Sequence, residues 1–351
     1  MLLQTISNIK SNIKYALTYS GIALLLTLTA CTSEPSINNT HVNAKNVVSQ
    51  HGNLSIHDGK IVNKNQQVVA FSGPSLFWSW NELEGERYYN AQSVKTFVDD
   101  WDANIIRAAM AAQGKGSYLT HPEDNLKKVE TVVDAAIAND IYVIVDWHSH
   151  HAERNVTEAI GFFTQIAKKY GHTANVIYEI YNEPLNNTDW DTVIKPYAEQ
   201  VIAAIRAIDP DNIIVVGTQT WSQDVDKAAR NPITNVENIA YTLHFYAGTH
   251  KEKLRAKAQV AIDAGLALFV TEWGTVNADG DGDIATESVE QWLAFMKEND
   301  LSHCSWSVTN KAEGSAFIKP STTSLGSWTD DELTANGIYS KNIIKQYNKV
   351  K

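Results

Sequence analysis

The feature that most constrains the fold of this chain is a regular alternation of short apolar segments with longer helix-like segments. Eight segments of strand length follow one another, at residues 67–73, 104–110, 141–148, 175–183, 212–217, 239–246, 266–273 and 302–308. Segments typical of helices lie between or after them, at residues 93–101, 123–139, 156–170, 190–208, 251–264, 286–299 and 340–347. Near-continuous apolar strands are typical of a parallel sheet covered by helices. Eight such units in about 290 residues predict an α/β fold, a (β/α)8 TIM barrel.

One large domain is predicted, at residues 51–351 of the 351-residue chain. It is expected to begin with a short β-hairpin at residues 54–62, whose turn is formed by Asp58 and Gly59. The hairpin is expected to lie across one end of the domain. No internal repeat, second domain or appended binding module is expected.

The first 30 residues are predicted to be a secretory signal peptide. Lys10 and Lys14 precede an apolar run at residues 21–30, which is too short to span a bilayer comfortably. The run ends in Leu-Thr-Ala-Cys31 and resembles a bacterial lipobox, in which the cysteine is lipidated after cleavage. Cleavage by a general signal peptidase is the alternative. Residues 31–50 would then be a lipidated cysteine and a flexible tether, since they are rich in Ser, Asn and Thr.

Export with a lipid anchor is therefore the expected location. Thr32 follows the cysteine, where an Asp in Gram-negative lipoproteins favours inner-membrane retention, so the outer membrane is favoured. A periplasmic or secreted protein is the alternative. If Cys31 carries lipid, Cys304 has no disulfide partner, and it is expected to be a buried strand residue.

Composition narrows the class of ligand. A formal net charge of -11 disfavours nucleic acid and anionic lipid as partners. Neutral polysaccharide remains possible, and the ten Trp and fourteen Tyr residues fit a site where sugars stack on aromatic rings. Many of these rings are also expected to serve the core. A monomer without a cofactor is predicted.

Two carboxylates end apolar strand segments and suggest the chemistry. Glu183 is followed by Pro184, which cannot donate to a sheet, and Glu272 ends the segment at residues 266–273. Active sites of TIM barrels lie at the carboxyl ends of the strands, where a carboxylate is a better catalyst than core residue. Other polar or aromatic residues at these ends are Arg107, His148, Asn182, His244, Tyr246 and Trp306. A pair of carboxylates predicts hydrolysis of glycosidic bonds.

These residues stand in motifs that resemble a known family. The motifs are Ile105-Ile-Arg107, Asp146-Trp-His148, Tyr178-Glu-Ile-Tyr-Asn-Glu-Pro184, His244-Phe-Tyr246, Val270-Thr-Glu-Trp-Gly274, and Ser305-Trp306 followed by Lys311 and Glu313. In this order, over about residues 54–347, the chain resembles a bacterial endoglucanase (cellulase) of glycoside hydrolase family 5. It departs from the family at Pro74, where Met is usual, and at residues 308–311, which differ from the commoner Leu-Asn-Asp-Lys.

The resemblance implies retaining hydrolysis of internal β-1,4 bonds in cellulose and related β-glucans. Glu183 would be the acid/base and Glu272 the nucleophile, with carboxyl groups about 5–5.5 Å apart. Arg107 and Tyr246 would stabilise the charge of Glu272. Burial and the charge of Glu272 would raise the pKa of Glu183. Asn182 would bond the 2-hydroxyl of the reacting sugar.

Further residues would bind the glucan by the same resemblance. His148 and His244 would bond sugar hydroxyls or orient the carboxylates. Trp306 would be a stacking floor, Trp78 would serve a more distant donor-side sugar and Trp221 the acceptor side, although the last two could be structural. Lys311 and Glu313 would bond donor-side hydroxyls. Alternatives are a mannanase, xyloglucanase or mixed-linkage glucanase of the same family, or a glycan-binding lipoprotein without catalysis.

Two sequence patterns resemble metal-binding sites, but each has a simpler interpretation. The histidines of residues 148–151 do not complete a metal-ligand spacing, so no metal is predicted there. Residues 277–283 resemble half of a calcium loop, but Ser288 stands where a Glu is required, which favours a solvated acidic loop. Glu179 is expected to form a structural ion pair inside the barrel. Because Asn182 and Glu183 must both reach the sugar, their strand should lose its regular alternation at its end.

Overall fold

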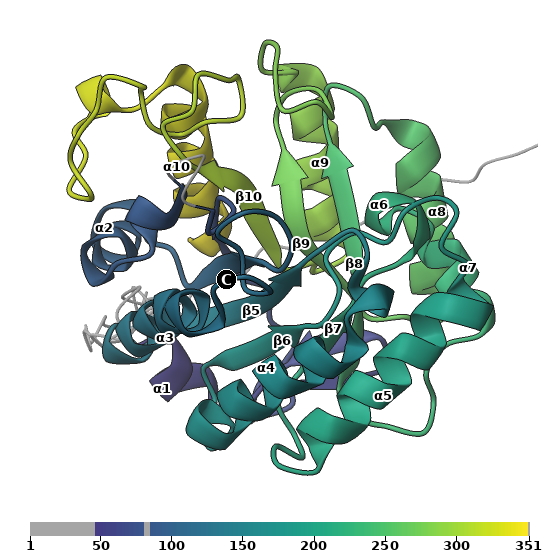
Figure 1. Ribbon diagram of the computed structural model, residues 1–351. Helices are drawn as coiled ribbons and strands as arrows, with labels where there is room; N and C mark the ends of the chain where they lie inside the picture. Colours follow the sequence, from purple (N-terminus) through teal and green to yellow (C-terminus); the bar gives the residue numbers. More distant parts are fainter. Residues whose placement is uncertain (1–45, 81–84, 350–351) are drawn as a thin grey trace, which may run out of the picture. The chain divides into compact units, whose positions relative to one another are not determined.

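The computed structural model describes residues 46–80 and 85–349, and these form a closed parallel barrel (Figure 1). The strands pair in the order β10-β3-β4-β5-β6-β7-β8-β9. They are β3 (Ser72–Leu76), β4 (Ile105–Ala111), β5 (Tyr142–His148), β6 (Val176–Glu179), β7 (Ile214–Val216), β8 (Ile239–Tyr246), β9 (Leu268–Gly274) and β10 (His303–Val308). The predicted TIM barrel is confirmed.

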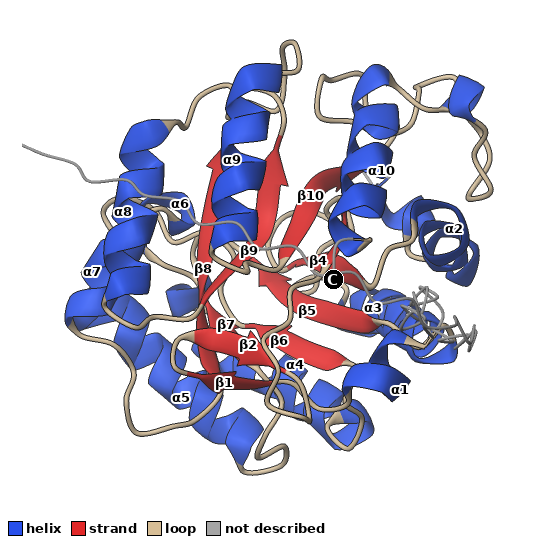
Figure 2. Cartoon of the chain, turned by 180° about the vertical axis from the view of Figure 1, so that it is seen from behind, coloured by secondary structure: helices blue, strands red, loops and turns tan. Residues whose placement is uncertain are grey.

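Helices cover the outside of the barrel, as Figure 2 shows. The long ones are α2 (Ala91–Trp101), α3 (Pro122–Ala138), α4 (Val156–Tyr170), α5 (Lys195–Arg206), α8 (Glu252–Asp263), α9 (Thr286–Glu298) and α10 (Ala335–Asn348). Shorter turns are η2 (Gly85–Tyr88), η3 (Ala152–Arg154), η4 (Trp190–Ile194), α6 (Gln219–Ser222), α7 (Val225–Arg230) and η5 (Asp330–Glu332). In α3 the buried positions include Val129, Val132, Val133 and Ala136, the spacing of one helix face.

The predicted hairpin is confirmed as β1 (Ser55–His57) and β2 (Lys60–Val62), paired antiparallel. Its turn residues Asp58 and Gly59 both have positive φ, as a two-residue turn requires. Ile56 N–H donates to the Asn238 side chain, and the Lys60 amine donates to Asn299 O. Since residues 238 and 299 precede β8 and β10, the hairpin lies across the amino ends of the strands.

The predicted boundary between tether and domain at residue 51 is wrong. Residues 47–51 form helix α1 (Val47–His51), in which Val47 and Val48 are buried. Val48 N–H donates to Asp140 O, and Ser49 bonds the Asp140 carboxylate. The prediction extended the tether to residue 50 because residues 32–50 as a whole are rich in Ser, Asn and Thr, and it gave no weight to Val47 and Val48. Residues 1–45, which carry the predicted signal, Cys31 and most of the tether, lie outside the described residues.

The first barrel strand begins later than predicted. The sequence places it on the apolar residues 67–73, whereas β3 begins at Ser72 and runs through small residues. Small residues are needed because β3 lies close to β4: a Cβ on Gly73 would stand 1.7 Å from Ile105 O. Residues 67–69 instead pair with the hairpin through Val62 and Val68.

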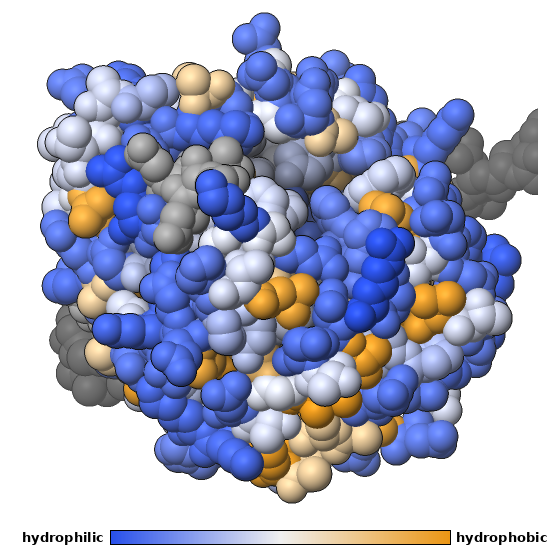
Figure 3. All heavy atoms as spheres, viewed as in Figure 1, coloured by the Kyte–Doolittle hydropathy of each residue, from blue (hydrophilic) through white to orange (hydrophobic). Residues whose placement is uncertain are grey.

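Other differences are smaller. The helix expected at residues 190–208 is divided into η4 and α5, and α10 begins five residues before the expected residue 340. Cys304 is buried, as predicted. In the described ranges no helix is both long enough and apolar enough to cross a bilayer. The face seen in Figure 3 is mostly hydrophilic, with scattered apolar patches.

Candidate active site

Glu183 and Glu272 meet at the carboxyl ends of the strands. Glu183 follows β6 and Glu272 lies in β9, and their side chains are 14% and 5% exposed. A carboxylate oxygen of each and a nitrogen of His244 lie within 4.8 Å of one another. The two carboxylates that the sequence singled out therefore face the same small space.

The end of β6 departs from regular strand geometry, as predicted. Ladder pairing stops at Glu179, four residues before Glu183. The chain is then held by longer bonds to the extension of β5: Asn182 N–H donates to Trp147 O at 3.4 Å, and Glu183 N–H donates to Ser149 O at 3.2 Å. Because alternation is lost, Asn182 and Glu183 both reach the site.

Arg107 is the electrostatic centre of the site. Its fully buried guanidinium donates through Nη1 to Glu272 at 2.8 Å, through Nε to Glu179 at 2.7 Å, and through Nη2 to Asp146 at 2.8 Å. The predicted ion pair of Glu179 is thus confirmed. Burial lowers the pKa of Arg107, but Asp146, Glu179 and Glu272 outweigh it and raise the pKa, so the cation is permanent.

Both oxygens of Glu272 accept a hydrogen bond. Tyr246 Oη donates to Oε1 at 2.7 Å, and Arg107 donates to Oε2. Burial raises the pKa of Glu272, and the nearby charge of Glu183 adds to this, while His244, Arg107 and Tyr246 oppose it; the pKa is raised overall. The two predicted partners of Glu272 are therefore in place.

Glu183 is held by two imidazoles. His244 Nδ1 lies 2.9 Å from Oε1, and His150 Nε2 lies 3.1 Å from Oε2. Burial raises the pKa of Glu183, but the hydrogen bonds from His150 and His244 outweigh it and lower the pKa to about 2. The predicted raised pKa is wrong, because the prediction counted burial and Glu272 but not two imidazole donors.

The proton position on His244 follows from its other partners. Thr271 Oγ1 donates to Glu179 Oε1 at 2.6 Å, because the pKa of Glu179 is lowered and a carboxylate only accepts. Burial raises the pKa of Glu179, but Arg107 and His244 outweigh it. Thr271 Oγ1 must then accept from His244 Nε2–H, 2.8 Å away. Burial lowers the pKa of His244, but Glu179 and Glu183 raise it to about 9.

Asn182 keeps one donor free. Its Oδ1 accepts from Arg107 Nη2 at 2.6 Å, which fixes the orientation of the amide. Its Nδ2 is buried and has no hydrogen-bond partner among the described residues. A buried donor without a partner is costly, so this atom is suited to a ligand oxygen.

His148 and Trp306 form a stacked wall. Their rings lie 5.5 Å apart at an angle of 4°, and His148 Nδ1 is 2.7 Å from Asp146 Oδ2. Burial and the charge of Arg107 lower the pKa of His148, so the ring is neutral. The peptide bond after Trp306 is cis.

The predicted donor-side residues gather beside this wall. Phe77 lies 5.3 Å from Trp306, and the Lys311 amine lies 5.8 Å from the Phe77 ring. Lys311 and Glu313 form an ion pair with each other. Trp78 contacts His148 edge-on, with ring centroids 4.3 Å apart. The structure thus brings Trp78, Trp306, Lys311 and Glu313 to one side of the site.

Trp221 lies on a strained loop on another side. It is 39% exposed, although most large apolar residues are buried. Three consecutive residues, Thr220, Trp221 and Ser222, have φ of 61°, 53° and 58°. This left-handed conformation is unfavourable for residues other than glycine. Trp221 N–H donates to Pro184 O at 2.8 Å, and Ser222 Oγ donates to Asn182 O at 2.7 Å. The loop is therefore tied to both neighbours of Glu183.

The sequence prediction missed His150 and Thr271 as partners of the site. His150 was considered only as part of a metal cluster. A useful signal was available: it follows His148 by two residues, and alternate residues of an extended segment point to the same side. Thr271 directly precedes Glu272 and gave no comparable signal.

One group of described residues has the spacing of possible metal ligands. In the part of the chain that the structure describes, only Glu183, His244 and Glu272 bring three potential metal-ligand atoms within 4.8 Å. In the acidic loop, Asp281 accepts from the N–H groups of Gly282 and Gly314, which lower its pKa, and Asp279 accepts from Asp281 N–H. These two carboxylates therefore accept hydrogen bonds from backbone N–H groups of the same loop and of Gly314.

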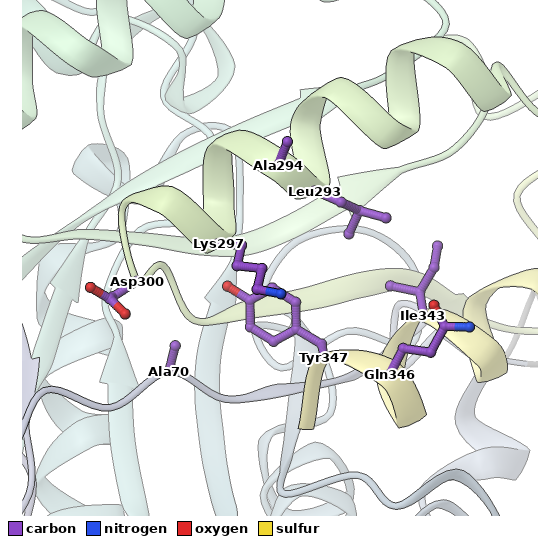
Figure 4. Close-up of a pocket in the computed structure, with 8 residues that line it drawn as sticks. All are labelled: Ala70, Leu293, Ala294, Lys297, Asp300, Ile343, Gln346 and Tyr347. Atoms are coloured by element: carbon purple, nitrogen blue, oxygen red, sulfur yellow. The ribbon is translucent and has the colours of Figure 1, made fainter. Parts of the chain in front are cut away.

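An apolar cavity of about 260 Å³ lies elsewhere, between α9 and α10 (Figure 4). Its lining residues are Ala70, Leu293, Ala294, Lys297, Asp300, Ile343, Gln346 and Tyr347. Ala70 precedes β3 and Asp300 precedes β10, so the cavity lies towards the amino ends of the strands, opposite to Glu183 and Glu272. Asp300 is the one carboxyl group among its lining residues, so the cavity does not offer the pair of carboxylates that glycosidic hydrolysis requires.

Comparisons with known proteins agree with this geometry. The chain is 52% identical over 294 residues to endoglucanase Z of Dickeya dadantii, covering 84% of this chain and 66% of that protein. It is 41% identical over 312 residues to an endoglucanase of Clostridium saccharobutylicum, covering 87% and 68%. The chain thus spans about two thirds of the length of these relatives.

Solved structures are similar as well. A structure from Cytophaga hutchinsonii has a TM-score of 0.84 and 46% identity, covering 87% of this chain and 98% of that one. The catalytic domain of a Thermobifida fusca endoglucanase, solved with cellotetraose, has a TM-score of 0.80 and 30% identity, covering 86% and 99%.

A family model adds to these pairwise similarities. The model described as Cellulase (glycosyl hydrolase family 5) matches residues 62–312 of the 351. The matched range includes β3 to β10, Glu183 and Glu272. The chain therefore belongs to glycosyl hydrolase family 5.

Proposed function

We propose that this protein is an endo-β-1,4-glucanase that hydrolyses internal bonds of cellulose and related β-glucans with retention. The observation that carries the proposal is the pair Glu183 and Glu272, whose nearest ligand atoms lie within 4.8 Å. Retaining glycosidases have carboxyls about 5–5.5 Å apart, whereas inverting enzymes need about 6.5–9.5 Å for a water molecule. The names of the similar proteins, and the cellotetraose bound to one of them, support a β-glucan substrate.

In the first step Glu272 attacks the anomeric carbon while Glu183 protonates the leaving oxygen. Arg107 and Tyr246 hold the two oxygens of Glu272 and fix the direction of attack. Negative charge leaves Glu272 as the glycosyl–enzyme bond forms. The free Nδ2 of Asn182 donates to the 2-hydroxyl, a bond that strengthens in the transition state.

In the second step Glu183, now a carboxylate, takes a proton from water, which attacks the anomeric carbon and releases Glu272. Trp306 and His148 form the wall on which the donor sugar lies, and Trp78 extends it. Lys311 and Glu313 bond hydroxyls on that side. Trp221, exposed on the loop beside Pro184, carries the acceptor side.

Replacing each carboxyl group tests the mechanism. Glu183→Ala and Glu272→Ala are assayed on carboxymethyl cellulose, and both should lose nearly all activity because acid and nucleophile act in the same cycle. Glu252→Ala is a control that removes an exposed carboxyl in the first turn of α8 and should retain the wild-type rate. Near wild-type rates in either catalytic variant would contradict the mechanism.

A product profile tests the substrate. The wild-type protein is incubated with carboxymethyl cellulose, mixed-linkage glucan, xyloglucan and mannan, and the oligosaccharides are separated by size. Internal cleavage of the cellulose derivative should give a rapid fall in viscosity with a range of product lengths. A preference for mannan or xyloglucan would replace the glucanase assignment with one of the alternatives, and binding without cleavage would favour a glycan-binding lipoprotein.

We also propose that the protein is exported and anchored to the outer membrane through lipidated Cys31, and that it is a monomer. The support is the basic and apolar pattern of residues 1–30 and the lipobox-like ending at Cys31. Expression in a Gram-negative host followed by membrane fractionation tests the anchor. Cys31→Ser should release the protein into the soluble fraction, and an unchanged distribution would contradict lipidation.

A further inference from the structure

His150 is hydrogen-bonded to the oxygen of Glu183 that must protonate the leaving group in the proposed reaction. Glu183 Oε1 is bonded to His244 Nδ1 at 2.9 Å, and Oε2 is bonded to His150 Nε2 at 3.1 Å. Both oxygens of the proposed acid are therefore engaged with imidazole nitrogens.

The two imidazoles differ in how firmly they are held. His244 is 1% exposed, and its Nε2 is bonded to Thr271, which is bonded in turn to Glu179. The side chain of His150 is 35% exposed, and among the described residues its ring has a hydrogen bond to Glu183 alone. A half-buried ring with one hydrogen-bond partner turns away at lower cost than the ring of His244, which is buried and bonded at both nitrogens.

The backbone at His150 is held by hydrogen bonds that do not involve its ring. His150 O accepts from the hydroxyl of buried Tyr181 at 3.1 Å, and the preceding Ser149 O accepts from Glu183 N–H. The ring of Trp78 stands edge-on to the His150 ring, with centroids 5.8 Å apart. Only rotation of the His150 side chain is therefore needed to uncover Oε2, and that rotation takes place beside a proposed sugar-binding ring.

The acid step conflicts with this arrangement of the side chains. A general acid must lie within about 2.6–3.2 Å of the leaving oxygen. Oε1 is turned to the firmly held His244, so the leaving oxygen must approach Oε2, where His150 lies. In addition, Glu183 is a carboxylate in this arrangement and has no proton to give.

We propose that His150 is a positioning residue that passes its Nε2 proton to Glu183 Oε2 as the glucan binds, and that the leaving oxygen then takes its place. The N–H bond of the imidazolium breaks, and the O–H bond of the carboxylic acid forms. The neutral ring turns away, and Glu183 is left uncharged and protonated towards the leaving oxygen. This inference rests on the proposed function.

The proton is expected to move from His150 to Glu183 because glucan binding removes water from around the ion pair. While water reaches the pair, carboxylate and imidazolium are both solvated and attract each other. A sugar over the site excludes that water and penalises the two charges more than the neutral pair. Other charged or titratable groups near His150 are Glu272, His244 and His148. After product release the exposed ring regains a proton from solvent.

The test compares His150→Gln with the matched control His151→Gln. Gln keeps a donor for Glu183 but cannot release a proton, and His151 is the adjacent histidine, 3.6 Å from Glu153 rather than at Glu183. The quantity measured is kcat/KM on a cello-oligosaccharide as a function of pH. In His150→Gln the alkaline limb should move at least about one pH unit towards acid, while the control profile should coincide with wild type.

A second substrate separates proton supply from simple damage. A dinitrophenyl cellobioside has a leaving group that needs no proton, so His150→Gln should retain most of its rate there and lose at least about tenfold on the oligosaccharide. Equal losses on both substrates, or a pH profile that coincides with wild type, would overturn the proposal. In the latter case His244 would be the source of the proton.

Nitrogen NMR of the wild-type protein tests the transfer without any variant. The ring of His150, assigned with ¹⁵N-histidine labelling, should have the shifts of an imidazolium in the free protein. It should have those of a neutral ring when a thio-linked, non-hydrolysable cello-oligosaccharide is bound. A ring that stays charged in the complex would refute the inference. Failure of the proposed function is distinguishable, since the wild-type protein would then cleave no β-glucan at any pH.

Discussion

Replacement of Arg107 by methionine probes how far the site and the stability of the barrel depend on one cation. Arg107 is fully buried and bonds three carboxyl groups, those of Asp146, Glu179 and Glu272. Methionine fills a similar volume but leaves these groups without their counter-ion. Removing one partner of a buried ion pair costs about 3–5 kcal/mol, because an uncompensated charge remains.

The magnitude has an upper limit for each carboxyl, because a buried carboxyl can take up a proton instead of staying charged. At pH 7, protonating a Glu with an ordinary pKa of about 4.3 costs about 3.7 kcal/mol. At least one of the three must be neutralised when the guanidinium is lost. We therefore expect the free energy of unfolding of Arg107→Met to fall by about 4 kcal/mol at pH 7.

The sign of the pH dependence follows from the same reasoning. Arg107 lowers the pKa values of Asp146, Glu179 and Glu272, so its removal raises all three in the folded state. A group with a raised folded pKa contributes stability that is present at low pH and lost as the pH rises through that pKa. The deficit of Arg107→Met should therefore shrink between pH 7 and pH 5, by about 1.4 kcal/mol per pH unit for each proton bound.

Urea unfolding followed by tryptophan fluorescence measures this deficit at pH 5 and pH 7. Arg230→Met is the matched control, because Arg230 is 76% exposed in its pair with Asp226 and should leave the unfolding curve unchanged. A deficit under about 1 kcal/mol at pH 7, or one that does not shrink at pH 5, would refute the reasoning.

Three further predictions concern single side chains. Tyr246→Phe removes one of two donors to Glu272 and should lower kcat by about 10²-fold in steady-state assays on carboxymethyl cellulose, and an unchanged kcat would contradict its role. Trp221→Ala should raise KM on long cello-oligosaccharides by about tenfold with kcat little changed, since the loss of about 1.4 kcal/mol of substrate binding on the exposed ring weakens affinity tenfold. Burial lowers the pKa of His303 to about 3, so the protein should lose stability as the pH falls from about 6.5 towards 3. His303→Gln should make unfolding less sensitive to acid in that range, and an equal sensitivity would show that His303 is not the group responsible.

The barrel could be predicted from the sequence because each strand and helix carries its own local signal. The spacing of apolar residues identified the elements, and Pro184 marked the place where a strand gives up a carboxylate. The predicted element boundaries were wrong where the buried residues are not strongly apolar. The strand β3 consists of small residues because Ile105 O passes too close for a side chain at Gly73. Helix α1 is held by Asp140, which is far away in the sequence.

The candidate site could be predicted as a set of residues but not as an electrostatic arrangement. Glu183 and Glu272 were placed together by the barrel rule alone. The pKa of Glu183 depends on His150, which lies just after β5, and on His244, which lies in β8. Burial and imidazole bonding act in opposite directions, and their balance depends on distances that only the folded chain defines. The sequence therefore predicted which groups meet, and the structure was needed for their charges.

The left-handed loop at residues 220–222 sets selection for stability against selection for function. Each non-glycine residue in this conformation costs about 1–2 kcal/mol, and glycine would relieve most of that cost. Laboratory evolution for heat resistance alone would favour glycine at residue 221, because glycine at 220 or 222 would lose the side-chain hydrogen bonds to Asp224 and Asn182. Growth on β-glucan would instead retain Trp221. The two selections should therefore diverge first at a single codon, and that divergence would reveal the ligand of the loop without a bound structure.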